Sequence, residues 1–387
     1  MLARYAEKLE ALRQANLYRK RNVFDGPQSP ETTINGAPYL LFASNSYLGL
    51  SNDAGIRARA MNALERFGVG AGGSRLTTGT SALHVELESL LASFKGSESA
   101  LVFSSGYTAN VGLLSTLCGA GDVILSDALN HASIIDGCRL SKATVIPFAH
   151  NDIADLQCKI SQTGGRPGLI VTEGLFSMDG DMAPLPELLR ISRENGLLLV
   201  VDDAHGTGTV GQTGRGSLEH FALPFEEHLV VVGTLSKALA SEGGFVCGSA
   251  VLCDYLRNTA RSHIFSTALS PVAVAAALGA VEHIQGNAGV VRTLHENVRY
   301  FCELLEGIGL PSHSATAIQP VHVGDEGAAA IASEALLRRG VFVPCIRYPT
   351  VKKGQARLRF SLMASHTRAQ MEYAVSCLGT VPGLKRS

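Results

Sequence analysis

The sequence predicts an α/β protein: a mainly parallel central sheet covered by helices, with a smaller C-terminal α+β domain. Between about residue 80 and residue 280, short runs that are apolar throughout alternate with segments of helical periodicity. Apolar runs without polar alternation indicate strands that are buried on both faces, and strands separated by helices indicate βαβ units. With 387 residues, the chain is long enough for more than one domain.

The expected elements follow one another in a regular order. The N-terminal segment 1–20 is amphipathic and predicts a helix. A helix over 81–96 places its leucines on one face and stops at a glycine. The helix over 184–196 begins at a proline and ends at a glycine, as helix ends prefer. The expected strands of this region are 100–103, 122–125, 168–173, 197–201, 229–232 and 245–248.

The pattern changes after about residue 280. A long helix over 293–309 is followed by a strand near 317–324, a further helix and a strand-like segment over 356–362. We therefore expect an N-terminal helical segment (1–40), a large domain (41–282) and a small C-terminal domain (283–387).

Composition excludes several classes of function. A formal net charge of −1 gives no global field that would attract nucleic acid or an anionic membrane. The eight cysteines are scattered without a CxxC pair, which favours a reducing cytosol over a disulfide framework or a zinc site. The N-terminus lacks the apolar core of a signal peptide, and the most apolar stretch, 268–284, is short and broken by Pro271. We expect a cytoplasmic protein without a metal, a nucleic-acid partner or a membrane partner.

Chemically capable side chains follow five of the predicted strands. In open α/β sheets, ligands bind at the carboxyl ends of the strands. Each of these residues alone has an ordinary structural explanation, but five groups at strand ends together predict a site. They are Ser104 to Tyr107, then Asp127, Asn130 and His131, then Ser177, then Asp202, Asp203 and His205, and finally Thr234, Ser236 and Lys237.

These residue types suit one cofactor. A lysine can hold an aldehyde as a Schiff base, and a carboxylate can keep a pyridine nitrogen protonated; pyridoxal phosphate requires both. Lys237 and Asp202 would supply this pair. A phosphate needs N–H and hydroxyl donors, and the candidates are Ser105, Gly106, Tyr107 and Thr234.

Two competing interpretations are weaker. The stretch GTGTVG at 206–211 matches a dinucleotide-binding fingerprint, but four residues separate it from the strand and the glycines that follow extend a loop. Asp202, Asp203 and His205 could bind a metal, but no further ligand stands at a convincing spacing. A nicotinamide oxidoreductase and a non-catalytic scaffold therefore remain the alternatives from other classes.

The sequence resembles the α-oxoamine synthases, which are pyridoxal-phosphate enzymes of aminotransferase fold type I. The resemblance covers nearly the whole chain, and its most specific motifs are VDDAHGTG at 201–208 and TLSKA at 234–238. GGSRLTTGT at 72–80 and HND at 150–152 favour the branch that acts in biotin biosynthesis. The resemblance implies that L-alanine condenses with a pimeloyl thioester, of coenzyme A or acyl carrier protein, with loss of CO₂ in a homodimer with shared sites. A sister reaction with glycine and another acyl thioester is the enzymatic alternative.

The resemblance also implies a role for each matching residue. Lys237, His131 and Asp202 form the expected catalytic set. The Gly106-Tyr107 pair departs mildly from the Gly-Phe that is frequent in the family. Expected cofactor contacts are Ser105, Gly106, Tyr107, His131, Ser177, Asp202, His205, Thr234 and Lys237, with Ser266 and Thr267 reaching the phosphate of the neighbouring subunit. Expected substrate contacts are Arg19 (or Arg21), Asn45, His131, Arg347 as a carboxylate clamp, and Thr350.

Overall fold

The computed structural model describes residues 2–15, 17–19, 21–166, 168–381 and 384. The chain divides into two compact units. The large unit is Asn45–His295, and the small unit combines Met1–Ser44 with Glu296–Ser387. The sequence pattern predicts a separate segment over residues 1–40 and a small domain that starts at 283. The structure instead groups the N-terminal part with the C-terminal part, because strand β2 (Ala37–Leu41) pairs with β11 (Val341–Phe342).

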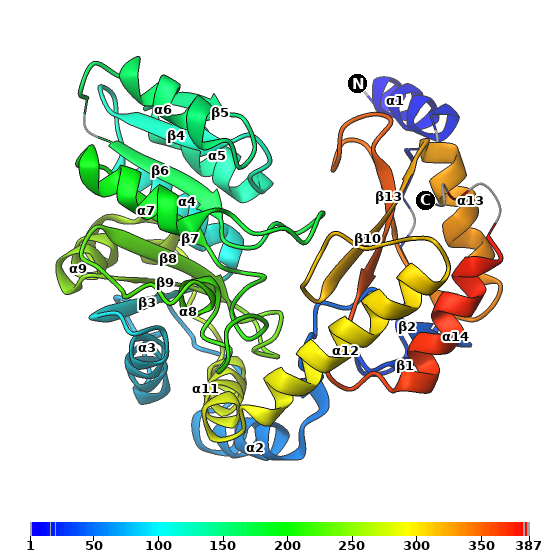
Figure 1. Cartoon of the computed structure of the whole chain (residues 1–387). Helices are drawn as coiled ribbons and strands as arrows, with labels where there is room; N and C mark the ends of the chain where they lie inside the picture. Colours follow the sequence, from blue (N-terminus) through cyan, green and yellow to red (C-terminus); the bar gives the residue numbers. More distant parts are fainter. Residues whose placement is uncertain (1, 16, 20, 167, 382–383, 385–387) are drawn as a thin grey trace. The chain divides into compact units, whose positions relative to one another are not determined.

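A seven-stranded sheet forms the centre of the large unit, in the order β3-β9-β8-β7-β6-β4-β5 (Figure 1). The pairs from β5 to β8 are parallel, and β9 is antiparallel to both of its neighbours. This architecture confirms the predicted fold class. The strands are β3 (Ser99–Phe103), β4 (Val123–Asp127), β5 (Thr144–Phe148), β6 (Gly168–Glu173), β7 (Leu198–Asp202), β8 (Leu229–Thr234) and β9 (Gly244–Gly248).

Strand β5 is the one strand of this sheet that the sequence analysis did not predict. It lies at the edge of the sheet, and four of its five residues are exposed or half-buried. It also contains Pro147, which is tolerated at a sheet edge but argues against a strand when only the sequence is read.

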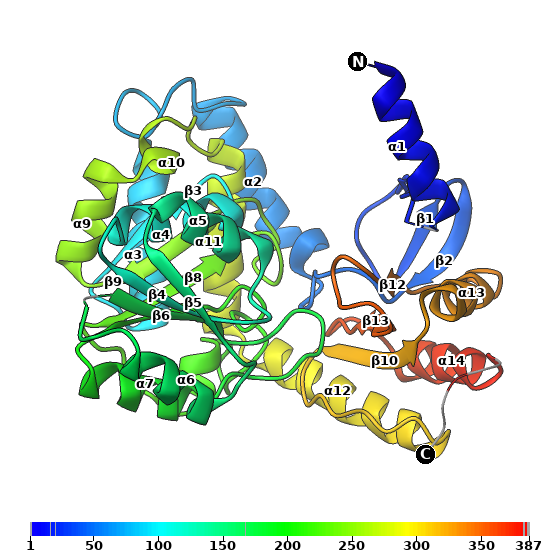
Figure 2. The same ribbon diagram turned by 90° about the horizontal axis from the view of Figure 1, so that it is seen from above.

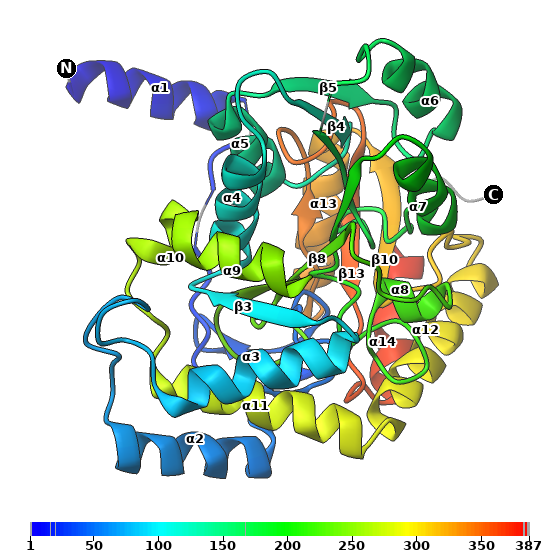
Figure 3. The same cartoon turned by 90° about the vertical axis from the view of Figure 1, so that its left-hand side faces the viewer.

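Helices cover both faces of this sheet. Figures 2 and 3 show α4 (Gly106–Leu117) and α5 (Ala132–Ser141) on one face and α6 (Ile153–Ser161) and α7 (Leu185–Glu194) on the other. One buried cluster joins Leu113 of α4 and Ile134 of α5 to alternate residues of the strands. The large unit also contains η1 (Leu50–Asn52), α2 (Ala54–Phe67), α3 (Ala82–Lys95), α8 (Ser217–His220), α9 (Ala250–Thr259), α10 (Arg261–Ile264) and α11 (Pro271–Gly286).

The small unit contains two three-stranded sheets, β1-β2-β11 and β10-β13-β12. Its aromatic core includes Phe42, whose ring stacks on His366 with centroids 4.3 Å apart and also packs against Phe301 and Phe360. Helix α12 (Gly289–Gly307) begins in the large unit and continues in the small one. The remaining elements are α1 (Leu2–Gln14), β1 (Glu31–Ile34), β10 (Ile318–Gly324), α13 (Glu326–Leu337), β12 (Cys345–Ile346), β13 (Ala356–Ser361) and α14 (Arg368–Gly379).

Candidate active site

Lys237 lies just after β8 and begins a chain of hydrogen bonds. Its Nζ is 2.7 Å from Nε2 of His205, and Nδ1 of His205 is 2.7 Å from the hydroxyl of Tyr47. The Tyr47 hydroxyl donates to Oδ1 of Asn45 at 3.0 Å. Because that hydroxyl proton is used on Asn45, the tyrosine accepts from Nδ1, and Nε2 is left as the acceptor for the lysine amine. The buried histidine therefore orients the amine at the end of the strand.

Asp202 ends β7 on the face that α4 and α5 cover. Side chains alternate along a strand, and Asp202 shares its face with Val200, a member of the buried cluster beneath α4 and α5. Nδ2 of Asn110 donates to Oδ2 of Asp202 at 2.6 Å, and the N–H of Ala204 donates to Oδ1 at 3.0 Å. Within the described part of the chain, no ion pair joins Asp202 to a cation. This buried carboxylate is therefore held by neutral donors.

The same hydrogen-bond network reaches His131, the N-cap residue of α5. Nδ2 of Asn110 also donates to the hydroxyl of Ser133 at 3.0 Å, and that oxygen is 2.8 Å from Nδ1 of His131. Burial lowers the pKa of His131 and the charge of Lys237 adds to this, while Asp202 opposes it. The imidazole is therefore neutral near pH 7 and linked to Asp202 through two intervening side chains.

Glu173 is a site residue that the sequence analysis missed. It ends β6, directly opposite Asp202 in the sheet register, and is 3% exposed. Burial and then the charge of Asp202 raise its pKa to about 8, whereas Lys237 and the backbone N–H groups of Ser177 and His131 act to lower it. The sequence signal is a charged residue at the end of an apolar run, and the predicted strand 168–173 includes it as its last residue.

Tyr47 and Asn110 were also missed, for a different reason. Tyr47 lies in the loop before η1, and Asn110 lies inside helix α4. Neither follows a strand of the central sheet, so the rule that located the other residues does not reach them.

Asp203 points to the opposite face of the sheet from Asp202. Its Oδ2 is 2.7 Å from Nζ of Lys95, and both side chains are 3% exposed. The lysine also donates to Oγ1 of Thr207 at 2.9 Å, and the N–H of Ser217 donates to Oδ1 of Asp203 at 3.1 Å. The second aspartate of the predicted cluster is therefore fully engaged by protein groups.

The N-terminus of α4 lies beside the end of β8. A Cβ on Gly244 would lie 2.5 Å from the Gly106 nitrogen, so this position needs glycine, and a Cβ on Gly106 would lie in tight contact with Thr234, 3.3 Å from its Cβ. Ser105 caps the helix, because its Oγ accepts from the N–H of Thr108 at 3.1 Å. The first N–H groups of a helix lack intrahelical acceptors, and Gly106, the first residue of α4, lies beside the Thr234 side chain. This arrangement suits an anion.

The other predicted cofactor residues occupy separate positions in the large unit. Tyr107 is 45% exposed, and its hydroxyl donates to Asp136. Ser177 is buried in the loop between β6 and α7. The Ser266 hydroxyl is 3.2 Å from that of Ser104, just before α4, and Thr267 forms a backbone bridge with Ser74.

The predicted substrate residues of the small unit gather at one cavity. Arg19, Arg347 and Thr350 all line a cavity of about 460 Å³, together with Tyr18 and Cys345. The N–H of Thr350 donates to the carbonyl of Arg347 at 3.0 Å, which holds the two residues in one turn. Arg19, rather than Arg21, is among the lining residues.

Two further findings concern the described residues only. They contain no group of three or more His, Cys, Asp and Glu side chains arranged to hold a metal ion. None of their helices combines the length and the apolar character that crossing a membrane requires.

Comparison with known proteins defines the class. A family model described as aminotransferase class I and II matches residues 37–378, and the chain belongs to this family. A protein of Desulfovibrio desulfuricans, provisionally named 8-amino-7-oxononanoate synthase, is 57% identical, with 96% of this chain and 97% of the relative covered. The 8-amino-7-oxononanoate synthase of Lysinibacillus sphaericus is 46% identical, with 96% of each chain covered.

Solved structures of similar fold agree with this family assignment. Serine palmitoyltransferase from S. paucimobilis, with a bound pyridoxal phosphate adduct, has a TM-score of 0.92 at 34% identity and covers 97% of this chain and 96% of its own. The 8-amino-7-oxononanoate synthase of Francisella tularensis has a TM-score of 0.76 at 30% identity, with 88% and 97% covered. These matches confirm the predicted family resemblance.

Proposed function

We propose that the protein condenses L-alanine with a pimeloyl thioester, with loss of CO₂, to form 8-amino-7-oxononanoate, an early step of biotin biosynthesis. Its cofactor in this proposal is pyridoxal 5′-phosphate. The full-length relatives that carry this activity in their names support the reaction. The observation that carries the proposal is the placement of Lys237 and Asp202 at the carboxyl ends of two neighbouring strands, β8 and β7.

The residues present fit this cofactor. Asp202 is a buried carboxylate with neutral donors, which suits a cationic ring nitrogen. The α4 N-terminus and the Thr234 hydroxyl suit a phosphate. When bound, the cofactor supplies an aldehyde that condenses with amines and a ring that accepts electrons from the carbon next to the amine. The holding residues would be Lys237, Asp202, His205 at the ring hydroxyl, His131 at the ring face, and Ser105, Gly106, Tyr107, Ser177, Thr234, Ser266 and Thr267.

The chain's own groups would move and hold protons. Nζ of Lys237 takes the proton from Cα of alanine, and His205 keeps that amine oriented through its 2.7 Å hydrogen bond. His131 is neutral and can donate from Nε2, because Ser133 occupies Nδ1. Asn110 fixes the carboxylate of Asp202 in place.

Substrate recognition is assigned to side chains with matching chemistry. A guanidinium fork binds a carboxylate through two parallel hydrogen bonds, so Arg347 would bind the carboxylate of alanine, with Thr350 beside it. Arg19, in the same cavity, would contact the acyl substrate, and Asn45 would lie near the amino acid.

The setting of the reaction is part of the proposal. We propose a cytoplasmic homodimer with shared sites. The acyl group would arrive on coenzyme A or on acyl carrier protein, and neither nucleic acid nor membrane would take part. All eight cysteines lack disulfide partners, which agrees with a reducing compartment.

A crossed substrate assay tests the reaction. The purified protein is given alanine or glycine with pimeloyl, acetyl or succinyl thioesters, and the products are identified by mass spectrometry. We expect alanine with the pimeloyl thioester to be the best pair, by about 10-fold or more per mismatched substrate. Faster turnover of glycine would assign the sister reaction. A colourless protein after cofactor addition, without absorbance that borohydride removes, would contradict the whole proposal.

A further inference from the structure

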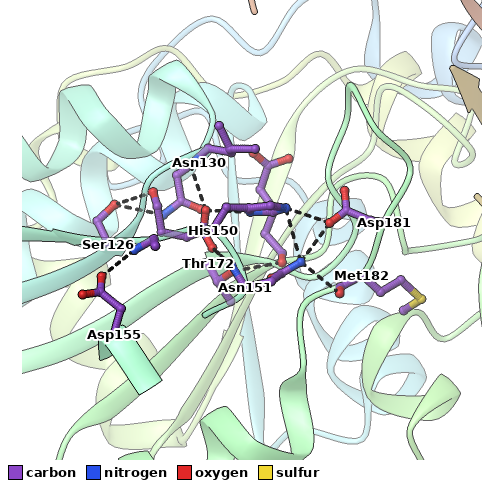
Figure 4. A network of polar contacts seen from close by, with 12 residues as sticks. Ser126, Asn130, His150, Asn151, Asp155, Thr172, Asp181 and Met182 are labelled. Atoms are coloured by element: carbon purple, nitrogen blue, oxygen red, sulfur yellow. Dashed lines mark hydrogen bonds and ion pairs between the residues drawn. The ribbon is translucent and has the colours of Figure 1, made fainter. Parts of the chain in front are cut away.

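His150 lies between two carboxylates at the outer part of the central sheet, away from Lys237. Its Nδ1 is 3.0 Å from Oδ1 of Asp127. Its Nε2 is 2.8 Å from Oδ2 of Asp181, and Figure 4 shows this contact. The Asp127 side chain is 1% exposed and the His150 side chain 26%. The histidine belongs to the HND stretch, to which the proposed reaction assigns no role.

The two contacts together require a charged ring. Ionised carboxylates only accept hydrogen bonds, so both ring nitrogens must carry a proton, and an imidazole with two N–H groups is a cation. Burial by itself would lower the pKa of His150, but the hydrogen bonds and charges of Asp127 and Asp181 outweigh burial and raise it to about 10. The cation is therefore the resting form near pH 7.

Asp127 fixes the turn that leads to His131. It ends β4, its Oδ1 also accepts from the N–H of Leu129 at 2.8 Å, and its Oδ2 accepts from the N–H of Asn151 at 2.9 Å. Asn130, next to His131, donates to Oγ of Ser126 and to the carbonyl of Val171, each at 2.9 Å. Four hydrogen bonds of 2.8–2.9 Å therefore hold this turn.

Asp181 fixes the loop that carries Ser177. This loop, 174–183, closes through the Phe176 N–H on the Asp181 carbonyl at 2.9 Å and the Ala183 N–H on the Gly174 carbonyl at 3.2 Å. Nδ2 of Asn151 donates to Oδ2 of Asp181 at 2.8 Å, as Figure 4 shows. The Phe176 ring packs edge-on against His150, with centroids 4.4 Å apart.

We propose that His150 is a positioning residue: through its two ring N–H groups it ties the Ser177 loop to the Asp127 turn, and so sets the spacing of Ser177 and His131 for the cofactor. The inference rests on the proposed function for the identity of the ligand. Glu173 supports it, because its carboxyl accepts from the backbone N–H groups of the same two residues, Ser177 and His131. Glu173 and His150 are therefore two separate links between the two segments.

The test compares His150→Gln with His150→Phe in the full-length protein, before and after pyridoxal phosphate is added. Glutamine keeps one donor and loses the ring, whereas phenylalanine keeps the ring against Phe176 and loses both donors. The readouts are hydrogen exchange of peptides covering 127–133 and 174–183, and the cofactor dissociation constant from absorbance. The control is Arg193→Gln, which breaks the exposed Arg193–Glu226 ion pair in the last turn of α7.

Hydrogen bonds to charged groups stabilise a folded segment more than neutral ones do. We therefore expect amide hydrogen exchange in the loop to rise about 10-fold in His150→Gln and about 100-fold in His150→Phe. The dissociation constant should rise in the same order, and Arg193→Gln should match the wild type in both readouts. If His150→Phe protects the loop better than His150→Gln, the ring acts by packing and the proposal is overturned. Unchanged cofactor affinity despite a loosened loop would overturn it as well.

Asp181→Asn covers the case in which neither His150 variant folds. This substitution weakens the His150–Asp181 hydrogen bond and leaves the His150–Asp127 hydrogen bond intact. Exchange should then rise in 174–183 and stay unchanged in 127–133; equal exchange in both segments, or no change, refutes the proposal. Exchange in the cofactor-free protein does not depend on the reaction, so this result and the crossed substrate assay can fail independently.

Discussion

Two neighbouring aspartates at the end of β7 belong to two differently built regions of the large unit. Asp202 is 6% exposed and Asp203 is 2% exposed, so burial does not distinguish them. Asp202 meets the amide of Asn110 and a backbone N–H, whereas Asp203 meets the ammonium of Lys95. Alternation along the strand sends one carboxylate to the face of α4 and the other to the opposite face.

The difference teaches how to separate a reactive carboxylate from a structural one. Removing a charge from water costs several kcal/mol, and a partner of opposite charge offsets that cost. At Asp203 the protein itself provides the cation. At Asp202 it provides only neutral donors, which leaves the charge for a cationic ligand.

The largest expected effect is a loss of turnover in the region of Asp202 and Lys237. Lys237→Ala should lower turnover by about 10⁴-fold or more, because the amine that moves the proton is lost. Steady-state kinetics with the exposed-site variant Lys8→Ala as control checks this; retained activity would remove Lys237 from the mechanism.

The next largest effect is a loss of stability in the region of Asp203 and Lys95. Lys95→Met should lower the free energy of unfolding by about 3–5 kcal/mol, because Asp203 is left buried without its cation. Denaturant unfolding measures the loss, and the double variant with Asp203→Asn should recover part of it. A single variant as stable as the wild type would mean that the pair contributes nothing.

The two aspartates can be compared directly by the same substitution. Asp202→Asn should lower turnover by about 10²- to 10³-fold with little loss of stability, since the residue is held by neutral donors. Asp203→Asn should mainly lower stability, because Lys95 then remains buried without a counter-charge. Steady-state kinetics and denaturant unfolding of both variants check this. A larger loss of stability in Asp202→Asn and a larger loss of turnover in Asp203→Asn would refute the distinction between the two aspartates.

The smallest effect concerns the pH dependence of the cofactor-free protein. The folded pKa of Glu173, about 8, lies above the usual 4.5, so the folded chain keeps a proton that the unfolded chain releases. Its contribution to stability is therefore present below about pH 4.5 and declines up to about pH 8, by at most about 1.4 kcal/mol per pH unit. Glu173→Gln should flatten this part of the stability profile; parallel profiles for the two proteins would show that Glu173 is ionised when buried.

Sequence patterns were sufficient to predict a residue's position where that position depends on the residues next to it in the chain. All six expected strands of the central sheet are present, and the polar residues after β8 and β7 do lie at the carboxyl ends of the strands. The same patterns failed for β5, whose exposed edge position weakens the apolar signal. They also failed for the start of the chain, because β1 and β2 join a sheet whose third strand lies about 300 residues later.

The sequence by itself determined the fold class, the family and the end of the sheet at which chemistry is expected, because strand periodicity and local motifs are properties of neighbouring residues. Only the tertiary structure decided which charge is neutralised and which is left for a ligand. Lys95 and Asp203 are 108 residues apart, and Asn110 and Asp202 are 92 apart. The partner of a buried charge depends on the packing of helices on the two faces of the sheet, and no local pattern in the chain specifies it.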